Sequence, residues 1–457
     1  MTAIPRPQTM YRDIAAPIFA ILLASLGTSI ANVALPHLAS AFAAKFSTVQ
    51  WVVIAYLLAL TVCSAGAGRF GDRIGHARAL QLGVAVFTLG ALAGAMAPQI
   101  WFLILARMVQ GAGAAMMIVL PMALLRNKAA PENLGRAMGL LGTASAMGTA
   151  LGPALGGFLV AGLGWRAIFG LMAALGLLCL WLGRDDGVVA KPAPLAGVID
   201  LRSGIAFGTA VAGIALTMTT PFRAISMGLL LASGISLLVF LRIERRAATP
   251  FIPAGALADA GLRRGLVANA LVAAVMMTTL VVGPFYLARG LGLGSGTVGL
   301  VLAVGPVLSA LTGVPAGRLV DRLGAARVAQ LGVMAMAFAV ALIAVLVPRF
   351  GLVGYLCGIA ILTPGYQLFL AANTTLVLTK AGAAIRGAIS GMLGLSRNLG
   401  LIIGAAGMGA LFARATGRAD AAIADPAQIG FAVTVSFGVA TVLLLCAVAL
   451  VRPARSA

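Results

Sequence analysis

Apolar stretches long enough to cross a bilayer recur along this chain from one end to the other, and they constrain its fold more than any other feature. Backbone N–H and C=O groups have no hydrogen-bond partner in lipid, so a stretch of about 20 apolar residues that enters a bilayer satisfies them internally as an α-helix. Since 61% of the 457 residues are hydrophobic and only 9% are charged, a water-soluble fold is excluded. We predict an all-α polytopic membrane protein.

Windows of about 20 residues predict fourteen spans. They lie near residues 14–36, 48–68, 79–98, 101–125, 137–161, 166–183, 203–220, 224–241, 265–288, 297–316, 328–347, 351–379, 387–412 and 428–451. The seventh and eighth spans form a short central pair. Omitting this pair would leave twelve spans and a water-exposed loop with two apolar runs, which would be prone to aggregate. We therefore favour fourteen.

The distribution of basic residues predicts the orientation. Cytoplasmic loops retain Lys and Arg, and most of the 32 basic residues fall on the side of the membrane that holds the N-terminus. The loops on the opposite side carry only Lys45, Arg166, Arg223, Arg289, Arg349, Arg414 and Arg418. Both termini are therefore predicted to be cytoplasmic. The net charge of +21 is scattered between apolar spans and does not form the basic cluster that nucleic-acid binding needs.

A charged loop occurs twice, which predicts two related halves. Residues 68–78 (GRFGDRIGHAR) and 317–327 (GRLVDRLGAAR) are identical at six positions at one constant offset of 249: two glycines, three arginines and the aspartate. A weaker repeat pairs Gly148 and Gly152 with Gly400 and Gly404. Such parallel repeats pack around a mid-membrane site. The expected units are an N-terminal six-helix bundle in 1–190, an inserted helix pair in 191–262 and a C-terminal six-helix bundle in 263–457.

These motifs resemble those of the major facilitator superfamily over nearly the whole chain. The loop at 68–78 is similar to the superfamily's loop between its second and third spans. Residues 107–113 (RMVQGAG) are similar to its fourth-span motif, and residues 148–157 (GTALGPALGG) to the fifth-span motif of exporters. The resemblance implies the major facilitator fold, transport by alternating access and a place in a bacterial inner (plasma) membrane.

Two further segments resemble the fourteen-span drug:proton antiporters of that superfamily. They are residues 29–36 (SIANVALP) in the first span, and residues 244–246 (ERR) with Pro250 before the ninth. The chain also departs from this group. The acidic residue usual shortly before the first segment is Gly27 here, and residues 172–174 (MAA) replace the usual Asn-x-Pro of the sixth span.

The duplicated loops carry the charges expected of a conformational latch. A carboxylate is stabilised by the partial positive charge of a neighbouring helix N-terminus, and arginines can pair with nearby acids. We expect these charges to hold the two halves together in the outward-facing state, and the set is Asp72, Arg73, Arg78, Glu132, Asp321, Arg322 and Arg327. The simpler interpretation is that they only fix the orientation of the loops.

A glycine motif in the fifth span predicts close helix packing. Gly148, Gly152 and Gly156 recur every four residues, so they share one helix face and let another helix approach closely. Pro153 adds a bend. The resemblance links this motif to export, whereas plain packing would need the same contacts.

The resemblance also implies a central cavity lined by spans one, four, nine and twelve. Arg107 and Arg397 lie within apolar spans, where a charge costs about 2.5 to 3.5 kcal/mol unless it faces a cavity or a partner. The candidate substrate-binding residues are Asn32, Arg107, Gln110, Met116, Asn269, Met276, Tyr286, Tyr366, Gln367, Asn373, Arg397 and Asn398. The alternative for both arginines is an internal hydrogen-bond network, and for the others helix packing.

The positions of the acidic residues constrain the predicted chemistry. All 11 lie in loops or at span ends, so the cavity is expected to lack the titratable carboxyl group that proton antiport normally needs. Coupling through Asp72, His37 or a proton carried by the substrate stays open, as does export without protons. Cationic drugs would find no partner, so neutral or anionic compounds fit better.

We therefore predict a monomeric secondary transporter that exports small amphipathic drugs or toxic metabolites. One alternative is a facilitator or importer of a specific neutral or anionic metabolite, and another is a membrane sensor without transport. No cofactor, metal cluster or catalytic residue set is expected. The expected partners are the small-molecule substrate, the lipid bilayer and, if transport is coupled, protons.

Overall fold

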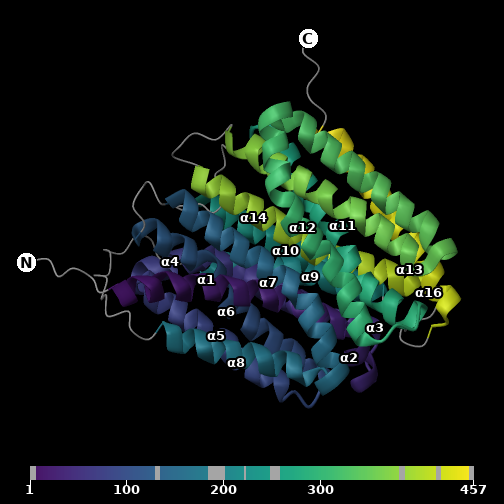
Figure 1. Cartoon of the computed structure of the whole chain (residues 1–457), viewed down its shortest axis with the longest axis horizontal. Coiled ribbons are helices and arrows are strands. Elements are labelled where there is room, and N and C mark those ends of the chain that lie inside the picture. Colours follow the sequence, from purple (N-terminus) through teal and green to yellow (C-terminus); the bar gives the residue numbers. More distant parts are fainter. Residues whose placement is uncertain are drawn as a thin grey trace, which may run out of the picture.

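Long apolar helices packed side by side make up the protein. The computed structural model describes residues 7–128, 134–183, 201–220, 223–246, 258–379, 386–417 and 424–451. Within these segments there are helices and turns but no strand. In Figure 1 the helices of the first half (purple to blue) occupy the lower left and those of the second half (green to yellow) the upper right. The predicted all-α membrane fold is confirmed.

The first half begins with a broken helix. It consists of α1 (Pro7–Ser29), the 3-10 turn η1 (Ile30–Ala34) and α2 (Leu35–Ala41). Pro36 lies in the first turn of α2, where its missing N–H leaves no hydrogen bond unmade. The remaining helices are α3 (Phe46–Val49), α4 (Trp51–Ile74), α5 (His76–Ala95), α6 (Ile100–Lys128), α7 (Leu134–Leu163) and α8 (Arg166–Leu182).

The second half repeats this plan after a central helix pair. The pair is α9 (Leu201–Thr219) and α10 (Arg223–Arg246). The second half contains α11 (Ala260–Phe285), η4 (Tyr286–Gly290), α12 (Ser295–Leu323), α13 (Ala325–Thr379), α14 (Arg386–Ile403), η5 (Gly404–Met408), α15 (Gly409–Ala415) and α16 (Pro426–Val451). Because α9 packs against α4 and also against α14, the central pair bridges the two halves. Trp51 Nε1 donates a hydrogen bond to Thr219 Oγ1 at 3.2 Å across the first of these contacts.

In the described segments, eleven helices are long and apolar enough to cross a membrane, fewer than the fourteen predicted spans. One of them, α13, is 55 residues long and contains a non-helical residue, Gly351, with φ 51° and ψ −120°. It therefore includes both predicted spans 328–347 and 351–379. The apolar helix α8 has only 17 residues, and α9 is not among the eleven. The number of spans stays a prediction.

Glycines bring equivalent helices together in both halves. On α7, a Cβ at Gly148 would overlap the carbonyl oxygen of Leu22 on α1. On α14, a Cβ at Gly400 would overlap the carbonyl oxygen of Ala270 on α11. Only glycine allows such an approach of one helix backbone to another. The sequence repeat therefore corresponds to the same helix contact made twice.

Candidate functional site

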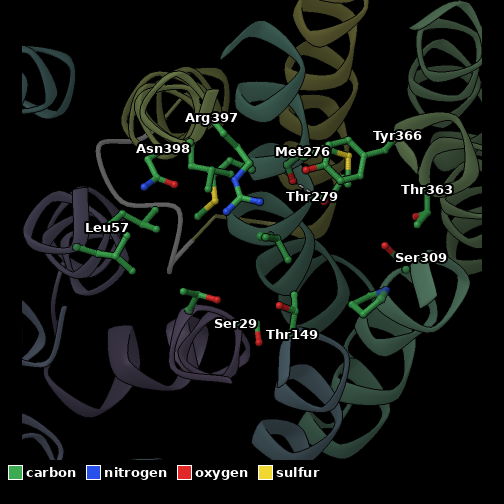
Figure 2. A pocket seen from close by; sticks show the side chains of 18 of the residues that line it. Ser29, Leu57, Thr149, Met276, Thr279, Ser309, Thr363, Tyr366, Arg397 and Asn398 are labelled. Carbon is green, nitrogen blue, oxygen red and sulfur yellow. Dashed lines mark hydrogen bonds between the residues drawn. The ribbon is translucent and has the colours of Figure 1, made fainter. Parts of the chain in front are cut away.

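A cavity of about 490 Å³ lies between the two halves. Its lining comes from α1, α4, α6 and α7 in the first half and from α11, α12, α13 and α14 in the second. The size is within the range of small-molecule sites, which are about 300 to 1,000 Å³. Figure 2 shows side chains from both halves converging on this space.

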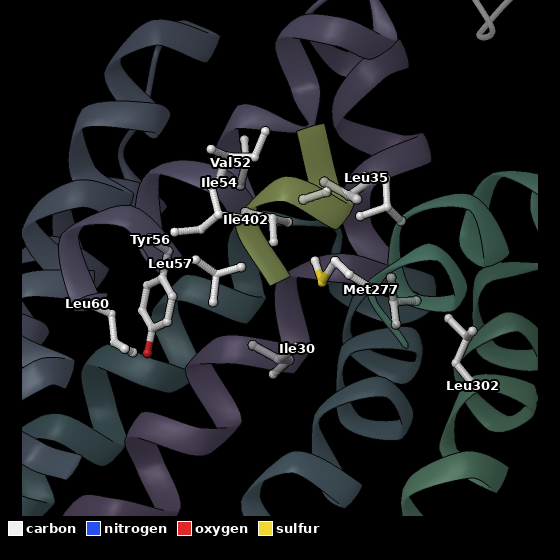
Figure 3. Packing of buried hydrophobic residues seen from close by; sticks show 14 of the residues in the cluster. Ile30, Leu35, Val52, Ile54, Tyr56, Leu57, Leu60, Met277, Leu302 and Ile402 are labelled. Atoms are coloured by element: carbon white, nitrogen blue, oxygen red, sulfur yellow. The ribbon is translucent and has the colours of Figure 1, made fainter. Parts of the chain in front are cut away.

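One end of the cavity is sealed by contacts between the halves. Phe46 of α3 packs against Phe285 of α11 and Phe412 of α15, with ring centroids 4.6 and 5.4 Å apart. Arg289 of η4 donates a hydrogen bond to Ser40 Oγ of α2. Below these rings, a buried apolar layer includes Ile30, Leu35, Met277, Leu302 and Ile402 (Figure 3).

Free space and an exposed lining residue, Gly391, lie toward the opposite end of the cavity. A Cβ at Gly391 or Gly394, both in the lining, would meet no atom within 4 Å. These glycines lie toward the helix ends that carry the duplicated loops, whereas the seal lies at the other ends. The structure is thus a conformation with access to the cavity from the side of Asp72 and Asp321.

The lining combines adaptable apolar side chains with small hydroxyl groups. The apolar members include Leu57, Leu60, Met276, Met277, Leu280 and Leu362. The hydroxyl-bearing members are Thr28, Ser29, Thr61, Ser64, Thr149, Thr279, Ser309, Tyr355, Thr363 and Tyr366. No Asp or Glu occurs among the described lining residues.

Arg397 is the charged side chain of this lining. It projects from α14 into the cavity and is exposed there (Figure 2). Asn398 follows it on the same helix and is also a lining residue. Met276 and Tyr366 complete the predicted substrate-binding residues that the structure brings together at the cavity.

Arg107 lies outside the cavity, in a buried network at the junction of α1, α4 and α6. Its side chain is only 1% exposed. Nε donates to the carbonyl oxygen of Val52 at 3.0 Å, Nη2 to that of Gly27 at 3.0 Å and Nη1 to Gln110 Oε1 at 2.6 Å. The guanidinium also lies 4.0 Å from the ring centroid of Tyr56. Arg107 and Gln110 therefore join helices of the first half and do not line the cavity, because protein groups already occupy their donors.

Three predicted asparagines are absent from the lining and donate hydrogen bonds to backbone carbonyl oxygens. Asn269 Nδ2 donates to the carbonyl oxygen of Leu393 at 2.9 Å, and Asn373 Nδ2 to that of Gly265 at 3.2 Å. Asn32 is 1% exposed and makes a long bond of 3.5 Å to the carbonyl oxygen of Thr28.

Three more predicted residues pack within one half. Met116 packs against Gly83 of α5, and Tyr286 against Tyr355 with ring centroids 6.1 Å apart. Gln367 donates to Ser309 Oγ, which itself lines the cavity. Gln367 thus contacts a lining residue but does not line the cavity itself.

Sequence reasoning missed the hydroxyl groups of the lining. Thr61 and Ser64 on α4 each donate to the backbone four residues earlier, at 2.6 Å. Such local bonds make Ser and Thr compatible with an apolar span, so they give little signal in hydropathy. The spacing of Leu57, Leu60, Thr61 and Ser64 along one helix face was the available signal.

The charged residues of the duplicated loops that the structure describes are mostly exposed. The Asp72 carboxylate lies 3.1 Å from His76 Nε2 and is 57% exposed. Arg73, Arg78 and the three charges of the second loop, Asp321, Arg322 and Arg327, are exposed as well. Glu132, the expected partner of the arginines, lies outside the described residues.

The glycine motif of α7 serves two contacts. Gly148 and Gly156 face backbone carbonyl oxygens of the first span, at Leu22 and Ile30, and Gly152 faces the side chain of Ser29. On another face of α7, a Cβ at Gly157 would lie 2.6 Å from the Cα of Gly299 on α12, and a Cβ at Gly299 would lie 2.6 Å from the carbonyl oxygen of Pro153. The same helix therefore packs tightly within its own half and across to the other half.

Comparison with known proteins agrees with this architecture. The family model described as Major Facilitator Superfamily matches residues 18–405. The drug efflux pump JefA of Mycobacterium tuberculosis is 31% identical over 87% of this chain and 80% of its own length. The riboflavin transporter RibZ of Clostridioides difficile is 26% identical over 86% of each chain.

Solved structures show the same fold. A bacterial homolog of the human lysosomal transporter Spinster, in an inward-facing and unoccupied conformation, has a TM-score of 0.71 at 15% sequence identity, with 98% of this chain and 97% of that chain covered. The family match, the two halves and the cavity between them lead to one conclusion: this chain belongs to the major facilitator superfamily and is an integral membrane transporter.

Proposed function

We propose that this transporter exports small amphipathic molecules, such as drugs or toxic metabolites, by alternating access. The observation that carries the proposal is the cavity between the halves, which is sealed at one end and lined by repackable apolar side chains and scattered hydroxyl groups. Methionine and other flexible apolar side chains adapt to ligands of varied shape. The relative JefA, a drug efflux pump, supports the same substrate class.

The direction follows from the predicted orientation. The excess of Lys and Arg in alternate loops puts the duplicated loops and both termini in the cytoplasm. The conformation described above then admits substrate from the cytoplasm. Opening the Phe46 seal while the duplicated loops of Asp72 and Asp321 come together would release substrate outside. In this proposal those loops act as the latch of the outward-facing state.

The fourteen-span arrangement belongs to the same proposal. Counting α13 as two spans and adding α8 and α9 to the long apolar helices gives this number. The central pair α9 and α10 then crosses the membrane at the edge where α4 of the first half faces α14 of the second. A monomer is part of the proposal, and it is compatible with a cavity whose described lining comes from both halves of one chain.

If transport is coupled to protons, we propose that the coupling group lies outside the described cavity lining. A proton antiporter usually holds a carboxyl group in its substrate path, and the described lining has none. Coupling would then use Asp72 or His37, or a proton carried by the substrate. Flux of radiolabelled chloramphenicol in proteoliposomes, measured with and without an imposed pH gradient, separates coupled from facilitated export. Absence of flux above that of empty liposomes for chloramphenicol, fluorescein and ethidium alike would contradict transport of amphipathic molecules.

A specific importer is the second candidate, and the similarity to the riboflavin transporter RibZ favours it. Accumulation in whole cells distinguishes the two directions. Export predicts that cells producing the protein hold less of a transported compound than cells with an empty vector, and import predicts that they hold more.

A further inference from the structure

We propose that Arg397 binds an anionic group of the transported molecule, so that the substrate class is a small amphipathic organic anion such as an aryl carboxylate. This inference rests on the proposed transport function and specifies its substrate. It is carried by four observations on α14 and its surroundings.

The face of α14 that carries the site is directed into the cavity. Gly391, Gly394, Asn398 and Leu401 line the cavity together with Arg397, and their spacing follows one side of an α-helix. Figure 2 shows the Arg397 guanidinium reaching toward the middle of the space. The side chain is therefore presented to whatever occupies the cavity.

The two intramembrane arginines differ in their partners. Arg107 is buried and makes three hydrogen bonds and a ring contact within the protein. Arg397 is exposed, and no described residue accepts a hydrogen bond from its guanidinium or forms an ion pair with it. A guanidinium has five N–H donors in a fork that matches carboxylate geometry. Arg397 keeps this capacity for a molecule in the cavity.

Packing of α14 does not use Arg397. Other groups hold α14 to α11: Ser396 Oγ donates to the carbonyl oxygen of Leu266, and Asn269 Nδ2 to that of Leu393. In the first half, the residue three positions before the equivalent glycine of α7 is Ser145, which hydrogen-bonds Ser25 at 2.8 Å. The equivalent contact in the first half, between α1 and α7, thus forms without an arginine. The charge of Arg397 is therefore not needed for this type of helix packing, and it occurs in the second half only.

The surroundings of Arg397 suit an amphipathic anion. The side-chain amide of Asn398, the next residue on α14, offers further N–H donors to an anionic group. The hydroxyl groups of Ser29, Thr149 and Thr279 donate to backbone carbonyl oxygens and add polar surface to the lining (Figure 2). Apolar side chains, including Leu57 and Met276, cover the remaining wall. A charged head would lie at Arg397 and an apolar body against this wall.

The charge balance of the cavity gives the same answer. A lone cation within a membrane protein is unfavourable unless water or a counter-charge accompanies it, and the described lining contributes no carboxylate. An organic anion would neutralise Arg397 on entry, whereas a cationic drug would meet like charge. The binding affinity is therefore expected to be highest for an anion, lower for a neutral compound and lowest for a cation.

Equilibrium binding to the purified full-length protein tests this order without depending on transport. Binding of radiolabelled 4-phenylbutyrate is measured in lipid nanodiscs, with 4-phenylbutyramide and 4-phenylbutylammonium as competitors that share its apolar body. The carboxylate is expected to bind about tenfold or more tightly than the amide, since hydrogen bonds to charged groups are roughly that much stronger, and the ammonium least tightly. Arg397→Gln should bring the carboxylate-to-amide ratio close to one, and Arg397→Lys should retain part of it.

Arg349→Gln is the matched control, because Arg349 is an exposed arginine beside the Gly351 kink of α13, outside the cavity lining, and its Nη1 donates to the carbonyl oxygen of Val345. Its carboxylate preference should equal that of the unchanged protein. A preference that survives Arg397→Gln overturns the inference, and so does undetectable binding of the carboxylate or tighter binding of the ammonium. Carboxylate-selective binding through Arg397 in a protein that moves no compound across liposomes would support this site while refuting the export proposal.

Discussion

The aromatic seal between the halves allows a quantitative test of alternating access. Phe46 is fully buried; its ring meets that of Phe285 edge to face and that of Phe412 at a tilt, and both partners belong to the other half. Each aromatic pair contributes about 0.5 to 1.5 kcal/mol beyond the burial of area. Phe46→Leu keeps an apolar side chain but removes both pairs, so it should weaken the sealed conformation by about 1 to 3 kcal/mol. At a factor of ten per 1.4 kcal/mol, the ratio of unsealed to sealed protein should rise roughly 5- to 150-fold.

A cysteine reporter in the cavity measures this ratio. Thr279→Cys is placed in a background in which Cys63, Cys179, Cys357 and Cys446 are replaced. Right-side-out membrane vesicles are then treated with a membrane-impermeant maleimide. Because Thr279 lines the cavity behind the seal, its labelling from outside requires the unsealed conformation, and Phe46→Leu should raise the labelling rate by the same factor.

Phe87→Leu provides the matched control for this measurement. Phe87 is equally buried, but its ring packs against Gly27 within the first half. This substitution should lower stability without favouring either conformation, so the labelling rate should stay unchanged. Equal labelling rates for Phe46→Leu and the unchanged protein would refute the assignment of these rings to the seal.

Three other predictions concern contacts away from the cavity. Arg107→Gln should lower the melting temperature in detergent, since each buried carbonyl left without its hydrogen bond costs about 1 to 3 kcal/mol. Arg397→Gln should leave the melting temperature unchanged, and equal melting temperatures of the two variants would contradict the buried network. Asp72→Asn should abolish transport with normal expression because the latch needs the carboxylate, and unimpaired flux would argue against the latch. Trp51→Phe should cost about 1 kcal/mol by removing the bond to Thr219 and should speed proteolysis next to α9; unchanged cleavage would contradict the bridging role.

The sequence was sufficient to predict the membrane fold, because each span is specified by its own composition. Span length alone also indicated most helix positions. The sequence could not show how α13 turns at Gly351, because the left-handed φ of that glycine is set by the packing of the two helical parts on either side. The repeat of Gly148 and Gly400 predicted a contact that the structure places between equivalent helices.

The cavity could be predicted only in part. Arg107 and Arg397 look alike in the sequence, as single charges within apolar spans. Their difference depends on tertiary packing: three helices meet around Arg107, whereas Arg397 is exposed and lines the cavity. The same limit applies to Asn269 and Asn373, whose amides are used by neighbouring backbones. A polar residue in a span indicates that its side chain has a polar partner. Only the folded structure shows whether that partner is a protein group or a molecule in the cavity.

Distances between the halves test the central claim, alternate opening of one cavity, most directly. Spin labels are attached at Lys45→Cys and Arg349→Cys on the sealed side. In a second protein they are attached at Leu82→Cys and Leu331→Cys, two exposed residues near the starts of α5 and α13, where these helices follow the duplicated loops. Pulsed electron paramagnetic resonance then compares each pair with and without Phe46→Leu. Alternating access predicts that the first distance lengthens while the second shortens. Movement of both distances in the same direction, or of neither, would contradict the account.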